Sequence, residues 1–229
     1  MDWQHVKSRE MEYFQFNWKQ VTCLYSTKHG NAAFVETFRP VMLKQVHSDT
    51  IVDTDVPHRG IGDGLITHTP GIHLGIRVAD CLPVYLFNKE RVCIIHCGWR
   101  GIINGIAQRA ARFMDTYVYT LGASIGACCY EIQEDVAQVF ETAYGSAVVP
   151  RGDKYFLDLK KAVQQDLGIK PLVSSLDFCT KCHPEYFYSF RGGDREARNY
   201  AVITSSTAGT TKGLPEETAC RTPRQLTFR

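Results

Sequence analysis

The chain has 229 residues, of which 44% are hydrophobic and 22% are charged, and its formal net charge is +2. This is the composition of an ordinary globular protein, and so small a net charge gives no reason to propose nucleic acid or an anionic membrane as the partner. The first residues lack an apolar stretch of signal-peptide length, and no run approaches the ~20 apolar residues of a membrane span. We therefore expect a cytoplasmic protein in which the nine cysteines are reduced thiols rather than a disulfide framework.

Hydrophobic periodicity predicts a mixture of hairpins and helices along the chain. Residues 17–53 are expected to form short strands joined by turns, and residues 61–100 are rich in strand patterns. Apolar residues then recur at helical spacing over 102–117, which predicts one helix packed on a sheet. The remaining predicted elements are helices over 131–144 and 156–167, with Asp158 near the start of the latter, and strands over 172–178 and 200–203. This mixture favours an α+β fold with mixed or antiparallel sheets.

The end of the chain differs from the rest in composition. After Ser205 the sequence is polar and rich in Thr, Pro and Arg, with little to bury. We expect a single domain over residues 1–205 and a weakly ordered tail over 206–229.

One predicted hairpin brings a cysteine and a histidine together. A strand-like run and a second apolar run flank residues 88–91, a polar stretch of hairpin-loop length. A loop centred there places Cys81 opposite Gly98 and Pro83 opposite His96. Cys81 and His96 are then diagonal neighbours on one face, roughly 7–8 Å apart at the backbone and within reach of one metal ion. A slip of one residue would separate them, and Pro83 indicates an edge or a bulge.

His47, from a separate segment, completes a set of three metal-ligand side chains with Cys81 and His96. Three protein ligands and one open position describe a catalytic zinc site, although nothing local places His47, and single histidines and cysteines often serve only packing. Asp80 lies in an apolar run, where a charge must be paired. It either orients a ligand or carries a proton, or it forms an ion pair with Arg77 or Arg100.

A second cysteine pattern does not indicate one particular function. Cys179 and Cys182 precede His183 in a C-x-x-C-H arrangement that matches covalent haem attachment, but that chemistry requires an exported chain. No second C-x-x-C completes a structural zinc site. Two thiols without a special role, or a redox pair, are the remaining interpretations.

Several motifs in order resemble the YfiH/YlmD-type laccase-domain family, also described as polyphenol-oxidase-like proteins. The resemblance runs from about Phe16 to Ile203. The motifs are QVH (45–47), DGLIT (63–67), the PG…LG.R.ADC.P pattern (70–83), HCGWRG (96–101), SIGACCYE (124–131) and FYSFR (187–191). The resemblance implies an α+β fold of layered sheets and helices, and a metal site formed by His47, Cys81 and His96. It also implies phosphorolysis of adenosine, inosine, guanosine or methylthioadenosine, and deamination of adenosine.

The chain departs from the usual family motifs at four places. Cys97 replaces an alanine and Ala127 replaces a proline, while residues 28–31 shorten an N-terminal turn. The last motif reads FRGGD over 190–194, with Arg198 later. These departures leave the three expected metal ligands intact and fall instead on substrate contacts in the N-terminal and C-terminal segments.

The chemistry of the two expected activities makes different demands. Zn²⁺ lowers the pKa of a bound water toward about 7, which suits attack on C6 of adenosine. Phosphorolysis needs an anion site, and the planar fork of arginine matches phosphate oxygens. Arg77, Arg100 and Arg191 are the candidates, and Gln45 is a candidate substrate contact near His47. Tyr130 and Phe187 could stack on a purine, although core packing is the default for both.

Three other interpretations stay open. Cys81 could be the nucleophile of a metal-independent amide hydrolase, with His96 or His47 as the base and Asp80 orienting it. The resemblance implies a substrate for that reaction, because a bacterial branch of the family is linked to editing of peptidoglycan precursors by amide hydrolysis. The same three side chains can bind copper, and the family resemblance includes laccase-like phenol oxidation. A multicopper oxidase needs many more than three histidines, however, and the chain has only eight. The chain could also bind a metal or partner without catalysis. Oligomeric state is not predicted.

Overall fold

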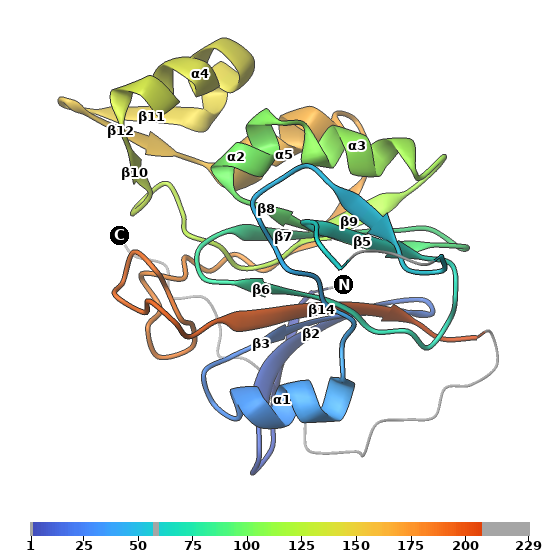
Figure 1. Ribbon diagram of the computed structural model, residues 1–229. Coiled ribbons are helices and arrows are strands. Elements are labelled where there is room, and N and C mark those ends of the chain that lie inside the picture. The colour runs from blue at the N-terminus through green and yellow to red at the C-terminus, as the bar shows by residue number, and fades with distance from the viewer. Residues whose placement is uncertain (1, 57–59, 208–229) are drawn as a thin grey trace.

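Two β-sheets packed face to face form the centre of the molecule, and helices cover their outer faces (Figure 1). The computed structural model describes residues 2–56 and 60–207. The space between the sheets is filled by apolar side chains such as Phe16, Tyr85 and Ile203. On the far side of the larger sheet, Ile95 and Leu86 pack against helical residues such as Ala107. The layered α+β architecture is the one predicted.

The smaller central sheet has five antiparallel strands in the order β1-β2-β3-β14-β6. Its strands are β1 (Gln4–Lys7), β2 (Glu12–Trp18), β3 (Val21–Ser26), β6 (Leu74–Val78) and β14 (Asn199–Ser205). Its outer face is covered by helix α1 (Asn31–Phe38), through Phe34 and Phe38 against Tyr13 and Val202.

The larger sheet has six strands in the order β13-β9-β7-β8-β5-β4, and only its two edge pairs are parallel. Its strands are β4 (Ile51–Asp53), β5 (Gly64–Thr67), β7 (Leu82–Phe87), β8 (Val92–Cys97), β9 (Val118–Leu121) and β13 (Leu172–Ser175). Helices α2 (Trp99–Ile103), α3 (Ile106–Arg112) and α5 (Leu159–Leu167) lie over its outer face (Figure 1).

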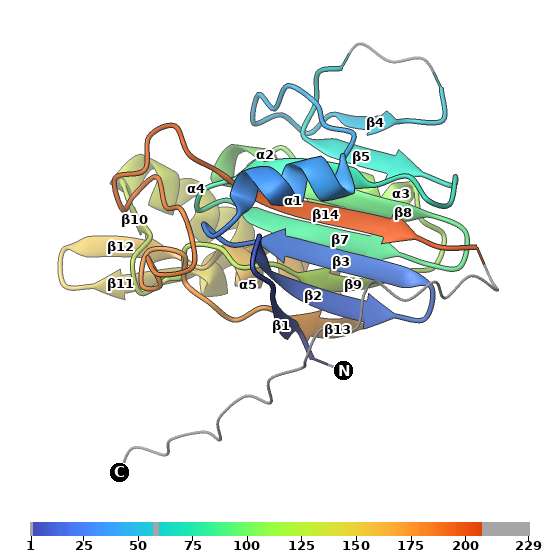
Figure 2. The same ribbon diagram turned by 90° about the horizontal axis from the view of Figure 1, so that it is seen from below.

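A third, smaller unit projects beside these layers (Figure 2). It has three antiparallel strands in the order β10-β12-β11. Its elements are β10 (Glu131–Ile132), helix α4 (Glu134–Tyr144), a 3₁₀ turn (Gly145–Ala147), β11 (Val148–Arg151) and β12 (Lys154–Leu157). No helix of residues 2–56 and 60–207 is long and apolar enough to cross a membrane.

Two predicted elements were wrong. Helix α1 forms within the region predicted to hold only strands and turns, because Phe34 and Phe38, four residues apart, both reach the buried face. The single helix predicted over 102–117 is instead two helices, α2, which begins earlier at Trp99, and α3, which ends at Arg112. The helix is broken between them because Gly105 has φ 81°. Asp158 was correctly placed, since its side chain accepts from the Lys161 N–H and caps α5.

The predicted hairpin has the predicted register. In β7 and β8, Pro83 pairs with His96 and Leu82 pairs with Cys97. Pro83 is tolerated in this central strand because it is the second residue of β7, one position before the ladder with β9 begins at Val84. The predicted tail lies, from residue 208 onward, outside the described residues.

Candidate active site

Three side chains with metal-binding atoms meet at the end of the hairpin. His96 lies in β8, Cys81 immediately precedes β7, and His47 lies in the loop before β4. Their ligand atoms all lie within 4.8 Å of one another, and the two imidazole rings are 4.9 Å apart at their centroids. A cysteine and two histidines so arranged suit a soft or borderline ion such as zinc or copper.

A buried carboxylate, Asp63, organises both histidines. Its oxygens accept from the backbone N–H groups of Val46, His47 and Ser48 at 3.2, 3.0 and 2.6 Å, and from the Ser48 hydroxyl at 2.8 Å. Asp63 also lies 2.9 Å from Nδ1 of His96. His47 has φ 59°, a conformation that costs energy for a residue with a β-carbon. The three backbone hydrogen bonds hold the loop in that strained shape.

The contact with Asp63 also selects the tautomer of His96. A carboxylate accepts a hydrogen bond, so Nδ1 of His96 carries the proton and Nε2 is left to face Cys81. This carboxylate–histidine arrangement is common at metal sites because it fixes the ring and raises the basicity of the ligand.

The charges of the group reinforce one another. Burial alone would raise the pKa of Asp63, but hydrogen bonds from His96 and Ser48 outweigh it and hold that pKa at about 2. Burial likewise opposes ionisation of Cys81, yet the adjacent His96 and His47 lower the pKa of the thiol to about 6. Burial disfavours the His96 cation, but Cys81 and Asp63 raise its pKa to about 9. Without a metal, a thiolate–imidazolium pair is therefore expected at neutral pH.

The close approach of these ligands requires a glycine. A β-carbon on Gly98 would lie 3.1 Å from Sγ of Cys81 and 3.1 Å from Cδ2 of His47. The missing side chain leaves the space in which the Cys81 and His47 side chains approach each other.

Asp80 is a second buried carboxylate, and its partners are not the predicted ones. Its oxygens accept from the Thr180 hydroxyl at 2.6 Å and from the Arg191 backbone N–H at 2.7 Å. Among the described residues, Asp80 forms no ion pair with Arg77 or Arg100, and its oxygens accept instead from a hydroxyl and a backbone N–H. Asp80 has φ 88° and directly precedes Cys81. It thus ties the start of β7 to two distant loops.

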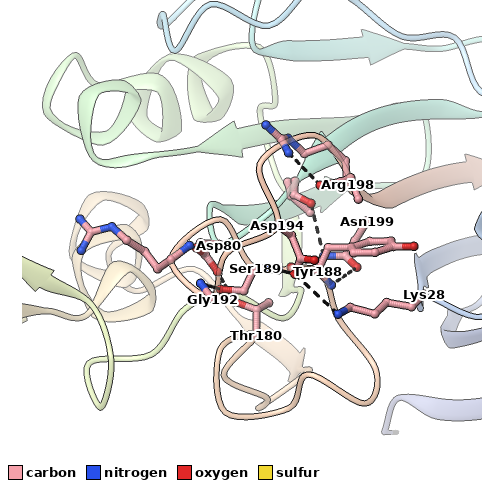
Figure 3. Close-up of polar contacts among 12 residues, drawn as sticks. Lys28, Asp80, Thr180, Tyr188, Ser189, Gly192, Asp194, Arg198 and Asn199 are labelled. Atoms are coloured by element: carbon pink, nitrogen blue, oxygen red, sulfur yellow. Dashed lines mark hydrogen bonds and ion pairs between the residues drawn. The ribbon is translucent and has the colours of Figure 1, made fainter.

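The loop over 188–199 is held by its own polar network (Figure 3). Asp194 accepts from the Ser189 N–H at 2.9 Å, and Asn199 bonds both backbone groups of Tyr188. Lys28 forms an ion pair with Asp194 at 3.6 Å. The two segments that depart from the usual motifs, 28–31 and 190–194, therefore contact each other.

A cleft of about 580 Å³ opens over the three ligands. Its charged lining residues are four arginines and two carboxylates, so the lining favours an anion. The lining residues are Gln45, His47, Arg77, Ala79, Asp80, Cys81, His96, Gly98, Trp99, Arg100, Tyr130, Phe190, Arg191, Glu196 and Arg198. All eight residues predicted for the site line this cleft.

The guanidinium groups of the three predicted arginines differ in the contacts that they make. Arg191 donates to the Glu131 carbonyl at 2.8 Å and lies over the Tyr130 ring at 5.0 Å. Arg100 stacks on the Trp99 ring at 4.5 Å. Within residues 2–56 and 60–207, the guanidinium groups of Arg77 and Arg100 have no hydrogen bond or ion pair, which leaves their donors available.

Gln45 and the two aromatic candidates are also placed. The Gln45 amide accepts from the Arg77 N–H at 2.8 Å and donates to its carbonyl at 2.9 Å, so it positions the Arg77 backbone. Tyr130 lines the cleft, whereas Phe187 is fully buried in the core between the sheets.

Comparisons with known proteins agree with this geometry. The family model described as multi-copper polyphenol oxidoreductase laccase matches residues 27–206. The chain belongs to this family. The curated purine nucleoside phosphorylase YfiH of Shigella flexneri is 31% identical over 72% of the chain and 73% of its own length. A purine nucleoside phosphorylase of Aquifex aeolicus is 32% identical over 62% of the chain and 71% of its own length.

A solved structure confirms the fold. The YfiH protein of Bacillus licheniformis superposes with a TM-score of 0.74 at 22% identity, covering 88% of this chain and 99% of that one. The resemblance to the YfiH/YlmD-type laccase-domain family is thereby confirmed, and curated relatives named as enzymes support an enzymatic role for this member.

Proposed function

We propose that the chain is a purine nucleoside phosphorylase with its active site at His47, Cys81 and His96. The observation that carries the proposal is the placement of these ligands in a cleft with four arginines. Phosphorolysis requires phosphate and a nucleoside in one site, and relatives of this chain are named for that activity. A phosphate oxygen attacks C1′ of the ribose, the bond from C1′ to the base breaks, and the departing base takes up one proton.

The proposed roles of the residues follow from their contacts. Among the described residues, the guanidinium groups of Arg77 and Arg100 make no hydrogen bond or ion pair, although Arg100 stacks on Trp99, and their planar forks suit phosphate oxygens. Arg191 is anchored to a backbone carbonyl and to Tyr130, so it fixes one wall against which a nucleoside can lie. Gln45 keeps Arg77 in position through both of its backbone groups.

The three ligands fit one zinc ion, with copper as the alternative. A zinc ion there would act as a Lewis acid and lower the pKa of a bound water, and this chemistry extends the proposal to deamination of adenosine at C6. His96 supplies Nε2 because Asp63 holds Nδ1, and His47 is aimed by the strained loop that Asp63 clamps. Phenol oxidation by several copper ions is not favoured, because the described part of the chain brings only two histidines to the cluster.

The eight described cysteines are free thiols. Such a number of unpaired thiols suits a reducing compartment, and we place the enzyme in the cytoplasm.

The deciding experiment is product analysis on adenosine with and without phosphate, using protein of known metal content. Adenine and ribose 1-phosphate formed only with phosphate would establish phosphorolysis, and inosine formed without phosphate would establish deamination. An Arg77→Gln variant should raise the KM for phosphate, with little change in the rate of deamination. Absence of turnover of every purine nucleoside tested with folded, metal-loaded protein would overturn the proposal.

A second candidate is supported by the ionisation of the thiol. The thiolate–imidazolium pair of Cys81 and His96 is the arrangement that activates a cysteine nucleophile. An amide hydrolase of that kind would act without metal. Hydrolysis of a peptidoglycan-derived amide by metal-free protein, lost in Cys81→Ser, would favour it over the phosphorylase.

A further inference from the structure

Four cysteine sulfurs converge outside the site described above. Cys128 and Cys129 lie in the loop between β9 and β10, and Cys179 and Cys182 lie between β13 and β14. All four Sγ atoms lie within 4.8 Å of one another. Sγ of Cys182 is 3.6 Å from that of Cys128 and 3.4 Å from that of Cys129.

These separations match a shared ion better than a covalent bond. Four sulfurs arranged tetrahedrally at about 2.3 Å from a zinc ion are about 3.8 Å apart. A disulfide needs about 2.05 Å, and all four cysteines are free. The set therefore has the number, type and spacing of ligands of a closed tetrathiolate site.

Two tight turns present the sulfurs. The N–H groups of Cys129 and Tyr130 both donate to the Gly126 carbonyl at 2.9 and 3.0 Å. This turn lets two adjacent cysteines face one point, whereas in a strand they would face opposite sides. The N–H groups of Cys182 and His183 likewise donate to the Cys179 carbonyl, both at 3.1 Å.

The surroundings suit negatively charged sulfur. The Gly126 N–H donates to Sγ of Cys179 at 3.3 Å, a contact that stabilises a thiolate. Arg151 donates to the carbonyl of Cys128 at 3.4 Å, and Lys181 lies within the Cys179–Cys182 turn. The two turns are joined directly, since the Thr180 N–H donates to the Ser124 carbonyl at 3.1 Å.

We propose that Cys128, Cys129, Cys179 and Cys182 bind one zinc ion in a structural site distinct from the His47–Cys81–His96 cluster. Four thiolates leave no open position, so this ion would do no chemistry on a substrate. Its role is to fasten one loop to the other.

The fastened loops form part of the wall of the cleft. Tyr130, which lines the cleft, directly follows Cys129. Thr180, between Cys179 and Cys182, donates to Asp80, which directly precedes Cys81 (Figure 3). Zinc at the four cysteines would thus be a positioning device for the cleft, acting through Thr180 and Tyr130.

The test is metal content per chain, measured by elemental analysis on protein purified without added chelator. In a Cys81→Ala variant, which leaves the four cysteines intact, we expect about one zinc per chain, released when an organomercurial titrates the thiols. Adding Cys179→Ser and Cys182→Ser should reduce zinc to near zero. Cys23→Ala, which removes a buried thiol of β3 in the core between the two sheets, is the matched control and should retain the metal.

Cobalt substitution supplies a spectroscopic readout independent of activity. Co²⁺ in the Cys81→Ala protein should give the intense visible bands and thiolate charge-transfer absorption of a tetrahedral sulfur site, and these should vanish with Cys179→Ser and Cys182→Ser. Iron in place of zinc, or a Cys81→Ala protein that is metal-free, folded and two mass units lighter per disulfide formed, would overturn the proposal. Because none of these measurements uses a nucleoside, failure here is distinguishable from failure of the proposed phosphorylase activity.

Discussion

The two cysteine-containing clusters of this protein differ in the way that active and structural metal sites differ. His47, Cys81 and His96 offer three mixed donor atoms that line a cleft, and the metal ion that we propose there would keep one coordination position open. The four-cysteine cluster (Cys128, Cys129, Cys179 and Cys182) provides a full set of sulfur ligands at the surface. The two clusters thus differ in the number of candidate ligands and in whether they line a cleft.

The scaffolds differ as well. Two of the three ligands in the cleft belong to or adjoin the rigid β7–β8 hairpin, and Asp63 supports both histidines. The four-cysteine cluster is carried by two turns, which are joined by backbone hydrogen bonds, by the hydrogen bond from the Gly126 N–H to Sγ of Cys179, and by contacts between cysteine sulfurs. The proposed site for chemistry is thus built on a strand pair, while the proposed zinc in the loops would add to the order of two turns.

The largest effect is expected from Cys81→Ser. The variant removes the thiolate ligand, and loss of Lewis-acid assistance of several kcal/mol corresponds to a fall in kcat/KM of about 10³-fold or more. Cys97→Ala is the matched control, because Cys97 is the thiol next to His96 in β8 but packs in the core on the helix side of the sheet. The kcat/KM of this control should stay within a few-fold of the parent. Steady-state rates on adenosine with phosphate provide the measurement. Equal losses in the two variants would contradict the assignment of Cys81.

The next effect is expected from Asp63→Asn. In this variant an amide NH₂ group would face a backbone N–H group that now donates to a carboxylate oxygen. Two donors cannot bond each other, so both histidines would lose the support of Asp63. Loss of such a partner typically costs about 10–100-fold in metal affinity or activity. Competition with a chelator measures the affinity.

Asp55→Asn is the control for that variant. Asp55 also accepts from a backbone N–H and from two threonine hydroxyls, but at His68, Thr67 and Thr69, which do not line the cleft. Its pKa is lowered to about 2 by these hydrogen bonds against the effect of burial. Asp55→Asn should therefore remove stability that the parent has above about pH 4 and loses as the pH falls toward 2, while metal affinity stays unchanged.

The ionisation of Cys81 gives a pH-dependent prediction. In metal-stripped protein, alkylation of this thiol by iodoacetamide should rise with pH around a midpoint of about 6, because only the thiolate reacts. Between pH 5 and pH 7 the rate should increase about tenfold. Peptide mapping by mass spectrometry identifies the modified residue. The buried Cys93, whose pKa burial raises to about 12, is the internal control and should stay unmodified. A Cys81 midpoint near 8.5 would contradict the ion pair.

The smallest effect is expected from the link between the two clusters. Thr180→Val removes the hydroxyl that Asp80 accepts, whereas Thr180→Ser keeps it. A buried hydrogen bond to a charged group contributes about 1.5–3 kcal/mol to stability. Its loss affects catalysis only to the extent that Asp80 shifts and moves the neighbouring Cys81. We expect a few-fold fall in kcat for Val and rescue by Ser. If both variants behave alike, Thr180 does not transmit order to the cleft.

The hairpin at the centre of the site could be predicted from sequence, because a short polar loop fixes strand register. Cys81 and His96 were placed that way, and the observed pairing of Pro83 with His96 confirms the register. His47 could not be placed locally, because it is brought in by a loop and a buried carboxylate 16 residues later in the chain. Only the family resemblance pointed to it.

The residues that sequence reasoning missed are those whose partners are distant. Asp63 stands in the DGLIT motif, and a charge ahead of an apolar run was the available signal. The four-cysteine cluster was missed because the C-x-x-C of Cys179 and Cys182 is completed by the adjacent pair Cys128 and Cys129 in a turn, rather than by another C-x-x-C. For Asp80 the sequence left two roles open, a partner of a ligand or an ion pair with Arg77 or Arg100, and its observed partners are neutral donors 100 and 111 residues away in the β13–β14 connection.

The shared carboxylate of the two histidines has a consequence for redesign. Any replacement of Asp63 alters both imidazole ligands at once, so their contributions should be strongly non-additive in double-mutant cycles. Cys81 is the only ligand of the three that makes no contact with Asp63 among the described residues. An engineer who wishes to change the preference of the proposed metal site should therefore begin at Cys81, where one of the three side chains can be exchanged while Asp63 keeps its hold on the other two.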